Sequence, residues 1–329
     1  MPETSRLNRP SLGIALVLAA VLAMSINDAL VKSLSGGYPL HQVVFTRALI
    51  GLALCLVFVR FEGGWSILKT RQPGLHFLRG LLIVIANSCF FAAIAVVPLG
   101  EATAIFFAAP LLITLFSVPV LGERIGPVRL AAVLIGFAGV LVMQRPWANA
   151  GDLGVSRIVL LLPLIAATTY ALQQVMTRRL GLTSKASAMA VYIQLVFFVV
   201  SITVGAIAGD GKFVAGLENP SLIFLLRPWI WPEAEDLWRF LALGMNIAVA
   251  SYCISAAYRT ADAGVLAPFE YCGLLLAVFW GWVFWGELPG LEVAFGIILI
   301  VSGGLAVYLR EKQLARRRAL HRDIGEMKS

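Results

Sequence analysis

Residues 100–143 read GEATAIFFAAPLLITLFSVPVLGERIGPVRLAAVLIGFAGVLVM, which is two apolar runs joined by the short polar connector Gly122-Glu123-Arg124. The chain uses this pattern twice. When the sequence is shifted so that Gly100 falls on Gly264, Gly122-Glu123 falls on Gly286-Glu287 without a gap. Internal repetition of this kind predicts a chain of two related halves. Each half is expected to end in a hairpin of two membrane spans.

The composition predicts a helical membrane protein. The 329 residues are 60% apolar and only 13% charged, which is too little polar surface to cover a water-soluble globule. The apolar residues form blocks of about 16–22 residues, the length of a helix that crosses about 30 Å of hydrocarbon. The alternating strands of about ten residues that a membrane β-barrel needs are absent from the sequence.

The apolar blocks predict an all-α integral membrane protein with ten transmembrane helices. The expected spans are residues 12–31, 40–59, 75–97, 102–120, 128–143, 158–176, 188–208, 240–258, 264–284 and 291–309. The first block is too long for a signal peptide, contains Asp28 and has no cleavage site after it, so we interpret it as a span.

Charge predicts the orientation of these spans. Lys and Arg are about three times as frequent on the side that holds both termini, which predicts that both termini are cytoplasmic. Because five is an odd number, the two five-helix halves would be inverted repeats. The net charge of +8 is explained by this loop bias, so a nucleic-acid partner is not expected.

Several kinds of site find no support in the sequence. The four cysteines all lie inside apolar runs, where they are expected to be packing residues. The three histidines have no metal-ligand spacing, so neither a metal nor another cofactor is predicted. Gly211-Lys212 lacks the context of a phosphate-binding loop, and no hydrolase motif is present, so we do not expect an enzyme.

Polar side chains at membrane depth are the candidates for function. Each costs about 2.5–3.5 kcal/mol at a helix centre on insertion scales, so such groups normally face a cavity or a partner. The substrate-binding candidates of the first half are Asn27, Asp28, Arg47 and Asn87. Asp28 could instead form a structural ion pair, either with Lys32 one turn later or with Arg47. Asn87 could form an interhelical hydrogen bond.

The second half offers a longer set of candidates. They are Tyr170, Gln173, Gln174, Asn246, Tyr252, Glu270 and Tyr271. The first three share one face of the sixth span and form a polar stripe. Glu270 lies inside the ninth span close to Pro268, which frees backbone carbonyls. Asp28 and Glu270 are the candidates for proton coupling, whereas Glu123 and Glu287 are expected to have turn or interface roles.

The longest loop, residues 208–238, is expected on the outer face. Its Trp-rich piece, residues 222–231, is expected to lie at the lipid headgroups.

The repeat resembles the drug/metabolite transporter superfamily, and in particular its EamA-domain families. The residues that support this are Pro98-Leu-Gly-Glu-Ala102, Leu121-Gly-Glu-Arg124, Trp285-Gly-Glu287 and the Gly-rich last span of each half. Asn27-Asp28-x-x-x-Lys32, followed by Phe45-Thr-Arg47, is similar to the bacterial uptake branches for riboflavin and S-adenosylmethionine. The second half departs from this pattern, because Gln173-Gln174 replaces the acidic pair and no arginine corresponds to Arg47.

The resemblance implies a domain organisation. Residues 1–11 would be a cytoplasmic N-terminus, 12–143 the first EamA-type half, 144–157 a linker, 158–309 the second half and 310–329 a basic cytoplasmic tail.

It also implies a secondary transporter of the bacterial inner membrane that moves a small organic metabolite by alternating access, with riboflavin or S-adenosylmethionine uptake as the leading expectation. The alternatives are an exporter of metabolites or amino acids from the same superfamily, and a membrane enzyme that acts on a lipid. The expected partners are the substrate and the bilayer. The sequence does not predict an oligomeric state.

Overall fold

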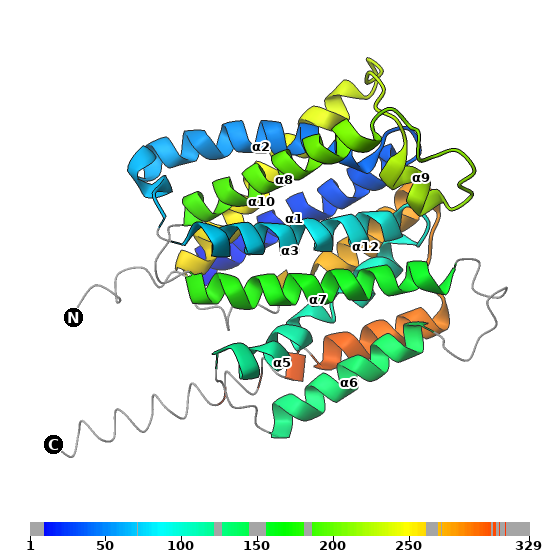
Figure 1. Cartoon of the computed structure of the whole chain (residues 1–329). Helices are drawn as coiled ribbons and strands as arrows, with labels where there is room; N and C mark the ends of the chain where they lie inside the picture. The colour runs from blue at the N-terminus through cyan, green and yellow to red at the C-terminus, as the bar shows by residue number, and fades with distance from the viewer. Residues whose placement is uncertain are drawn as a thin grey trace.

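The computed structural model describes residues 10–309, apart from 71, 122–126, 145–155, 181–185, 261–268, 271, 304 and 307–308, together with residue 313. Within these residues most of the backbone is helical and no strand occurs (Figure 1). The predicted all-α class is therefore confirmed for the described chain. The expected terminal segments 1–11 and 310–329 and the linker 144–157 lie largely outside it.

The helices run in the order of the apolar blocks. Their bounds are α1 Pro10–Leu34, α2 Leu40–Glu62, the short 3-10 helix η1 Trp65–Leu68, α3 Pro73–Ile94, α4 Leu99–Phe106, α5 Ala109–Leu121, α6 Pro127–Gln144, α7 Arg157–Leu180, α8 Ala186–Ala208, α9 Pro220–Leu226, α10 Leu237–Thr260 and α12 Cys272–Trp285. A further apolar helix covers Leu291–Gly303.

Among the described residues, 6 helices are long and apolar enough to cross a membrane. They are Ser11–Leu34, Leu40–Phe61, Pro73–Ile94, Arg157–Met176, Ser187–Ala208 and Leu237–Ile254, which coincide with the first, second, third, sixth, seventh and eighth expected spans. Shorter apolar helices at Leu99–Ile113, Leu134–Met143, Cys272–Trp285 and Leu291–Gly303 overlap the other four. A multi-pass membrane protein is thereby confirmed, whereas the count of ten spans stays a prediction.

The fourth expected span, residues 102–120, is interrupted in the middle. α4 ends at Phe106, and α5 begins at Ala109 after a turn of two residues. Pro110 has no N–H to donate to the carbonyl of Phe106, so the helical ladder loses a rung there. The N–H groups of Leu111 and Leu112 both donate to the Ala108 carbonyl, each at 3.1 Å. The fourth expected span is therefore broken just before Pro110.

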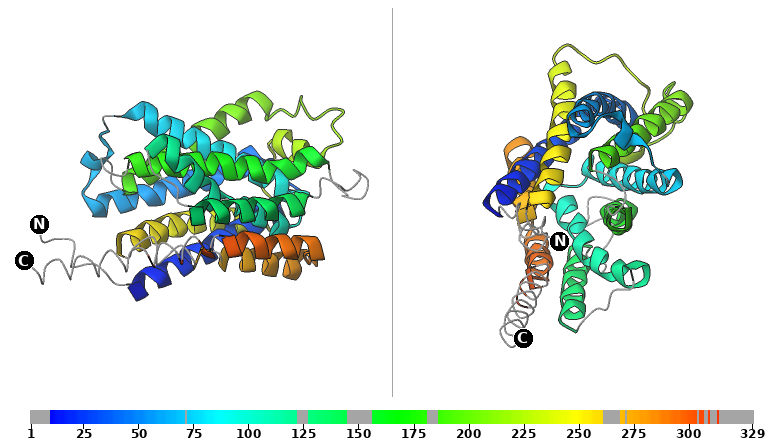
Figure 2. Two further views of the ribbon diagram at one scale, coloured as in Figure 1. Left: turned by 90° about the horizontal axis from the view of Figure 1, so that it is seen from below. Right: turned by 90° about the vertical axis from the view of Figure 1, so that its left-hand side faces the viewer.

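The long helices pack in pairs that join distant parts of the chain. α1 packs against α10, α3 against α7, and α2 against α8. Seen along the bundle (Figure 2, right), α2 and α8 lie at one edge, where α2 packs against α10 and α8 packs against α3, so they join the α1–α10 pair to the α3–α7 pair. Most of the contacts between the described helices therefore join one half of the sequence to the other.

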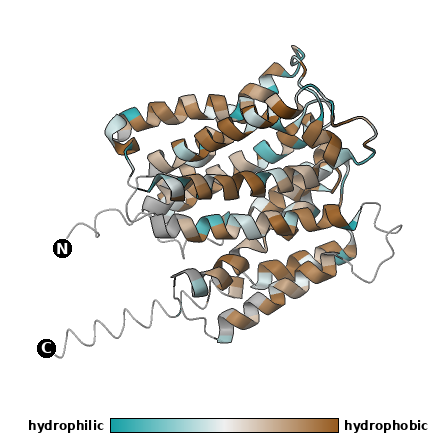
Figure 3. Ribbon diagram, viewed as in Figure 1, coloured by the Kyte–Doolittle hydropathy of each residue, from teal (hydrophilic) through white to brown (hydrophobic). Residues whose placement is uncertain are grey.

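Apolar residues cover the helices along their length (Figure 3). Many large apolar side chains on the long helices are exposed, such as Leu18 and Leu22 on α1 and Leu195 and Val199 on α8. An exposed apolar surface of this extent is typical of a protein solvated by lipid.

The loop around α9 is fastened to the start of α2 at one end of the bundle. Gln42 donates from its side chain to the Ile230 carbonyl at 2.6 Å and accepts from the Ile230 N–H at 3.2 Å. Tyr38 donates to an Asp236 carboxylate oxygen at 2.7 Å. Trp231, by contrast, is 92% exposed. The expected position of this loop at the headgroups stays a prediction.

α6 and the Leu291–Gly303 helix cross closely at two glycines. A Cβ added to Gly139 would lie 2.8 Å from the backbone oxygen of Gly296, and one added to Gly296 would lie 2.9 Å from that of Gly139. Small residues allow this approach in membrane helices.

We predict that Gly139→Ala lowers the melting temperature of the purified protein. The added methyl group meets backbone, which cannot rotate aside, and overpacking costs roughly 1–3 kcal/mol. Gly74→Ala is the matched control, because nothing lies within 4 Å of a Cβ at that helical position. Equal melting temperatures of the two variants would contradict the close crossing.

Candidate functional site

Three sequence candidates meet between α1 and α2. Asn27 is 3% exposed and Arg47 is 2% exposed, and each lies about two turns from the nearer end of its helix. Arg47 Nη1 donates to Asn27 Oδ1 at 3.5 Å, and Asn27 Nδ2 donates to Asp28 Oδ1 at 3.2 Å. Asp28 also interacts electrostatically with Arg47. Arg47 thus contacts Asn27 directly and interacts with the next residue, Asp28, through its charge.

Aromatic rings complete the surroundings of Arg47. Its guanidinium carbon lies 5.3 Å from the ring centre of Phe91 on α3 and 5.3 Å from that of Phe197 on α8. Cation–π contacts of this kind offset part of the cost of burying a cation. Arg47 Nε has no hydrogen-bond partner among the described residues. The guanidinium therefore has a donor left for a ligand.

A second cluster lies on α7. Gln174 Nε2 donates to the hydroxyl oxygen of Tyr170 at 2.7 Å, and Tyr170 interacts electrostatically with Glu270. Gln173 is 4% exposed. The structure thus brings Tyr170, Gln174 and Glu270 together. Gln173, the residue before Gln174, is buried as well.

A row of aromatic rings connects the two clusters. Phe91 lies 5.8 Å from Phe90, Phe90 lies 5.3 Å from Phe106, and Phe106 lies 5.2 Å from Tyr170, measured between ring centres. Phe106 is the last residue of α4, directly before the break. Phe90, Phe91 and Phe197 are not among the site residues that the sequence predicts. Only the position of Phe90-Phe91 one turn after Asn87 pointed toward the first two.

The remaining candidates make other contacts. Asn87 donates to the Ile83 carbonyl at 3.0 Å and Asn246 to the Ala242 carbonyl at 2.9 Å, each within its own helix. Tyr252 is 46% exposed and stacks on Phe58 with 4.9 Å between ring centres. Tyr271 lies outside the described residues. The described contacts therefore place only part of the predicted set in the two clusters.

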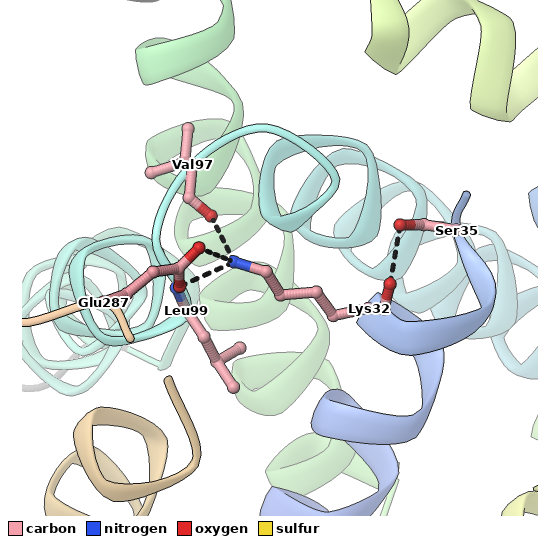
Figure 4. A network of polar contacts seen from close by, with 5 residues as sticks. All are labelled: Lys32, Ser35, Val97, Leu99 and Glu287. Carbon is pink, nitrogen blue, oxygen red and sulfur yellow. Dashed lines mark hydrogen bonds and ion pairs between the residues drawn. The ribbon is translucent and has the colours of Figure 1, made fainter. Parts of the chain in front are cut away.

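Lys32 is the largest departure from the sequence expectation. The sequence allows it to pair with Asp28, four residues earlier on α1. In the structure its ammonium group contacts Glu287, with Lys32 Nζ 2.7 Å from Oε1 and 2.8 Å from Oε2 (Figure 4). Glu287 follows α12 and is separated from Lys32 by 255 positions. The interface role expected for Glu287 thus has a specific partner.

The fold and the site define a multi-pass helical membrane protein with charged and polar groups buried among its spans. Residues 11–145 match the EamA-like transporter family. The resemblance to the EamA-domain families of the drug/metabolite transporter superfamily, which the sequence indicated, is thereby confirmed.

Relatives match almost the whole chain. The riboflavin transporter of Vibrio cholerae serotype O1 is 29% identical over 94% of this chain and 97% of its own. The S-adenosylmethionine uptake transporter of Rickettsia prowazekii is 25% identical over 92% and 94%, and the pseudopaline exporter CntI of Pseudomonas aeruginosa is 26% identical over 88% and 94%. These relatives are named as transporters, in agreement with the prediction that this chain is not an enzyme.

A solved crystal structure of a protein has the same fold. It aligns with a TM-score of 0.63 over 92% of this chain and 99% of its own, at 23% identity.

We predict that Asp28→Asn lowers the melting temperature more than Arg47→Met does. Removing Asp28 leaves a buried guanidinium that cannot lose its proton, whereas removing Arg47 leaves a carboxyl that can take one up. The comparison uses thermal unfolding of the purified variants. Asp210→Asn is the control, because Asp210 is 59% exposed in its pair with Lys212 and such pairs contribute little. The reverse order of the two buried variants would contradict an Asp28–Arg47 pair.

Proposed function

We propose that the chain is a secondary transporter of the bacterial inner membrane that moves a small organic metabolite by alternating access. The observation that supports this best is the pair of polar clusters at membrane depth, joined by aromatic rings at a broken helix. Transporters typically bind substrate near the midplane where a helix is discontinuous. The relatives named as transporters support the same function.

The proposal includes ten spans in two inverted repeats, residues 12–143 and 158–309, with both termini cytoplasmic. The helix pairing supports it. An inverted repeat exchanges α1 with α7, α2 with α8, and α3 with α10. Under this exchange the α1–α10 contact corresponds to the α7–α3 contact, and the α2–α10 contact corresponds to the α8–α3 contact. All four contacts are present. A repeat with a two-fold axis in the membrane plane has this property.

The sequence supports the same repeat through its charges. Lys32 corresponds to Arg178, and Glu287 corresponds to Glu123, so each half has a cation near the end of its first span and an acid in its last connector. The side chains of Glu123 and Arg178 lie outside the described residues.

The chemistry of the clusters favours a substrate with a planar ring and charged or strongly polar groups. Phe90, Phe91 and Phe106 offer ring faces, Arg47 offers a hydrogen-bond donor, and Asp28 offers an acceptor. Uptake of riboflavin or S-adenosylmethionine fits this description and the names of two relatives. Export is the second candidate, because a third relative is named as an exporter.

We predict that Arg47→Met reduces transport on the order of tenfold or more, since losing a hydrogen bond to a charged group costs roughly 1.5–3 kcal/mol. The measurement is uptake of labelled riboflavin and labelled S-adenosylmethionine into liposomes that contain only this protein. Loading the compounds inside instead tests export. Thr203→Val, on the exposed face of α8, is the control and keeps the parent rate.

The same liposomes test proton coupling. Glu270→Gln keeps the size and hydrogen bonding of the side chain but cannot titrate. If Glu270 couples transport to protons, this variant transports at a rate independent of a pH gradient, and an unaltered pH profile assigns coupling to Asp28 instead. No movement of any supplied compound in either direction, relative to empty liposomes, would contradict the proposed function.

A further inference from the structure

The Lys32 ammonium group is held by three acceptors at one end of the bundle. Besides the two Glu287 oxygens at 2.7 and 2.8 Å, it donates to the Val97 carbonyl at 3.2 Å (Figure 4). Three acceptors match the three hydrogens of an ammonium group. The ring of Trp285 lies 4.9 Å from Lys32 Nζ. Lys32 is only 8% exposed, so the contact closes over it.

Glu287 is placed by the turn that ends α12. Gly286 has a φ of 66°, a conformation that glycine adopts without strain, and its N–H donates to the Trp282 carbonyl at 3.0 Å. Glu287 Oε2 then accepts from the Leu99 N–H at 3.1 Å, at the first turn of α4. The carboxylate thus meets the positive end of α4, and Lys32 lies in the last turn of α1, so both charges also suit the helix dipoles.

This contact lies directly above the candidate site. Lys32 is one helical turn, about 6 Å, beyond Asp28 on α1. α4 begins at the contact with Leu99 and ends at Phe106, which belongs to the aromatic row. α12 packs against both α1 and α4. The Lys32–Glu287 contact therefore joins α1 to the segment after α12 and to the start of α4 at this end of the bundle, one turn beyond Asp28.

We propose that Lys32 and Glu287 form the gate of the transport path at this end, closed in this structure and broken when the site opens here. This inference rests on the proposed transport function. An ion pair suits a contact that opens and closes, because both charged groups are hydrated when they separate, whereas separated apolar surfaces are not. The Glu287 side chain is already 24% exposed, so water has access to one partner.

The gate is tested by access to a buried position below it. Asn27→Cys, introduced after the four native cysteines are replaced by alanine, places a thiol where the parent residue is 3% exposed. The protein in lipid nanodiscs is treated with a charged, membrane-impermeant methanethiosulfonate reagent. Adding Glu287→Gln, which keeps the shape of the side chain, is expected to raise the modification rate at least tenfold. That ratio corresponds to about 1.4 kcal/mol between open and closed forms.

Further variants separate a gate from a merely structural contact. Asp210→Asn removes the acid of the exposed Lys212–Asp210 pair and leaves the rate unchanged. Lys32→Glu accelerates modification, and adding Glu287→Lys reverses only part of the effect, because the exchanged pair cannot restore the bonds to Val97 and Leu99. Spin labels at Gly36 and Leu288 report the same opening as a longer distance.

The outcome that overturns the gate is an unchanged modification rate and label distance in folded Glu287→Gln protein. Circular dichroism and gel filtration establish that the variant is folded. Neither readout needs a substrate, so a failure of the gate is distinguished from a failure of transport in liposomes.

Discussion

The absence of water in the hydrocarbon layer is the constraint on which this structure depends. Every polar group placed there needs a partner within the protein, because the lipid offers none. The apolar faces of the helices therefore point outward, and Arg47, Asn27 and Gln173 are turned inward, each with less than a twentieth of its surface exposed. Burying the Arg47 guanidinium at this depth costs free energy that an apolar side chain packed at the same position would not cost. That cost is explained if the residue serves a ligand.

The sequence predicted the parts of the fold that follow from local physics. Apolar blocks of span length became helices. The sequence did not predict contacts between distant residues. Nothing in the spacing of Lys32 and Glu287 shows that they meet, and Asp28 was the nearer candidate. The sequence does not distinguish Phe197 from the many other apolar residues, and only the packing of α8 places it against Arg47. Predicted polar residues such as Tyr252 were indistinguishable from those of the clusters, because depth and composition do not tell which face of a helix is buried.

α1 connects the candidate site to the Lys32–Glu287 contact at the end of the bundle. This helix holds Asn27 and Asp28 in the candidate site and Lys32 in the contact that closes the end above it. α4 repeats the arrangement, with Leu99 at the closed end and Phe106 at the site. A change in the position of either helix thus acts on the closed end and the site together. This coupling within single helices is the physical basis on which we propose alternating access.

Ligand-dependent thermal unfolding of the parent protein and of Arg47→Met tests the central claim, that the Arg47 cluster binds the substrate, most directly. The panel contains riboflavin, S-adenosylmethionine, nucleosides and amino acids. A ligand at a hundred times its dissociation constant stabilises a protein by about 2.7 kcal/mol. The account predicts that at least one compound raises the melting temperature of the parent and that the shift is lost in Arg47→Met. No shift with any of these compounds, or an equal shift in both proteins, would contradict it.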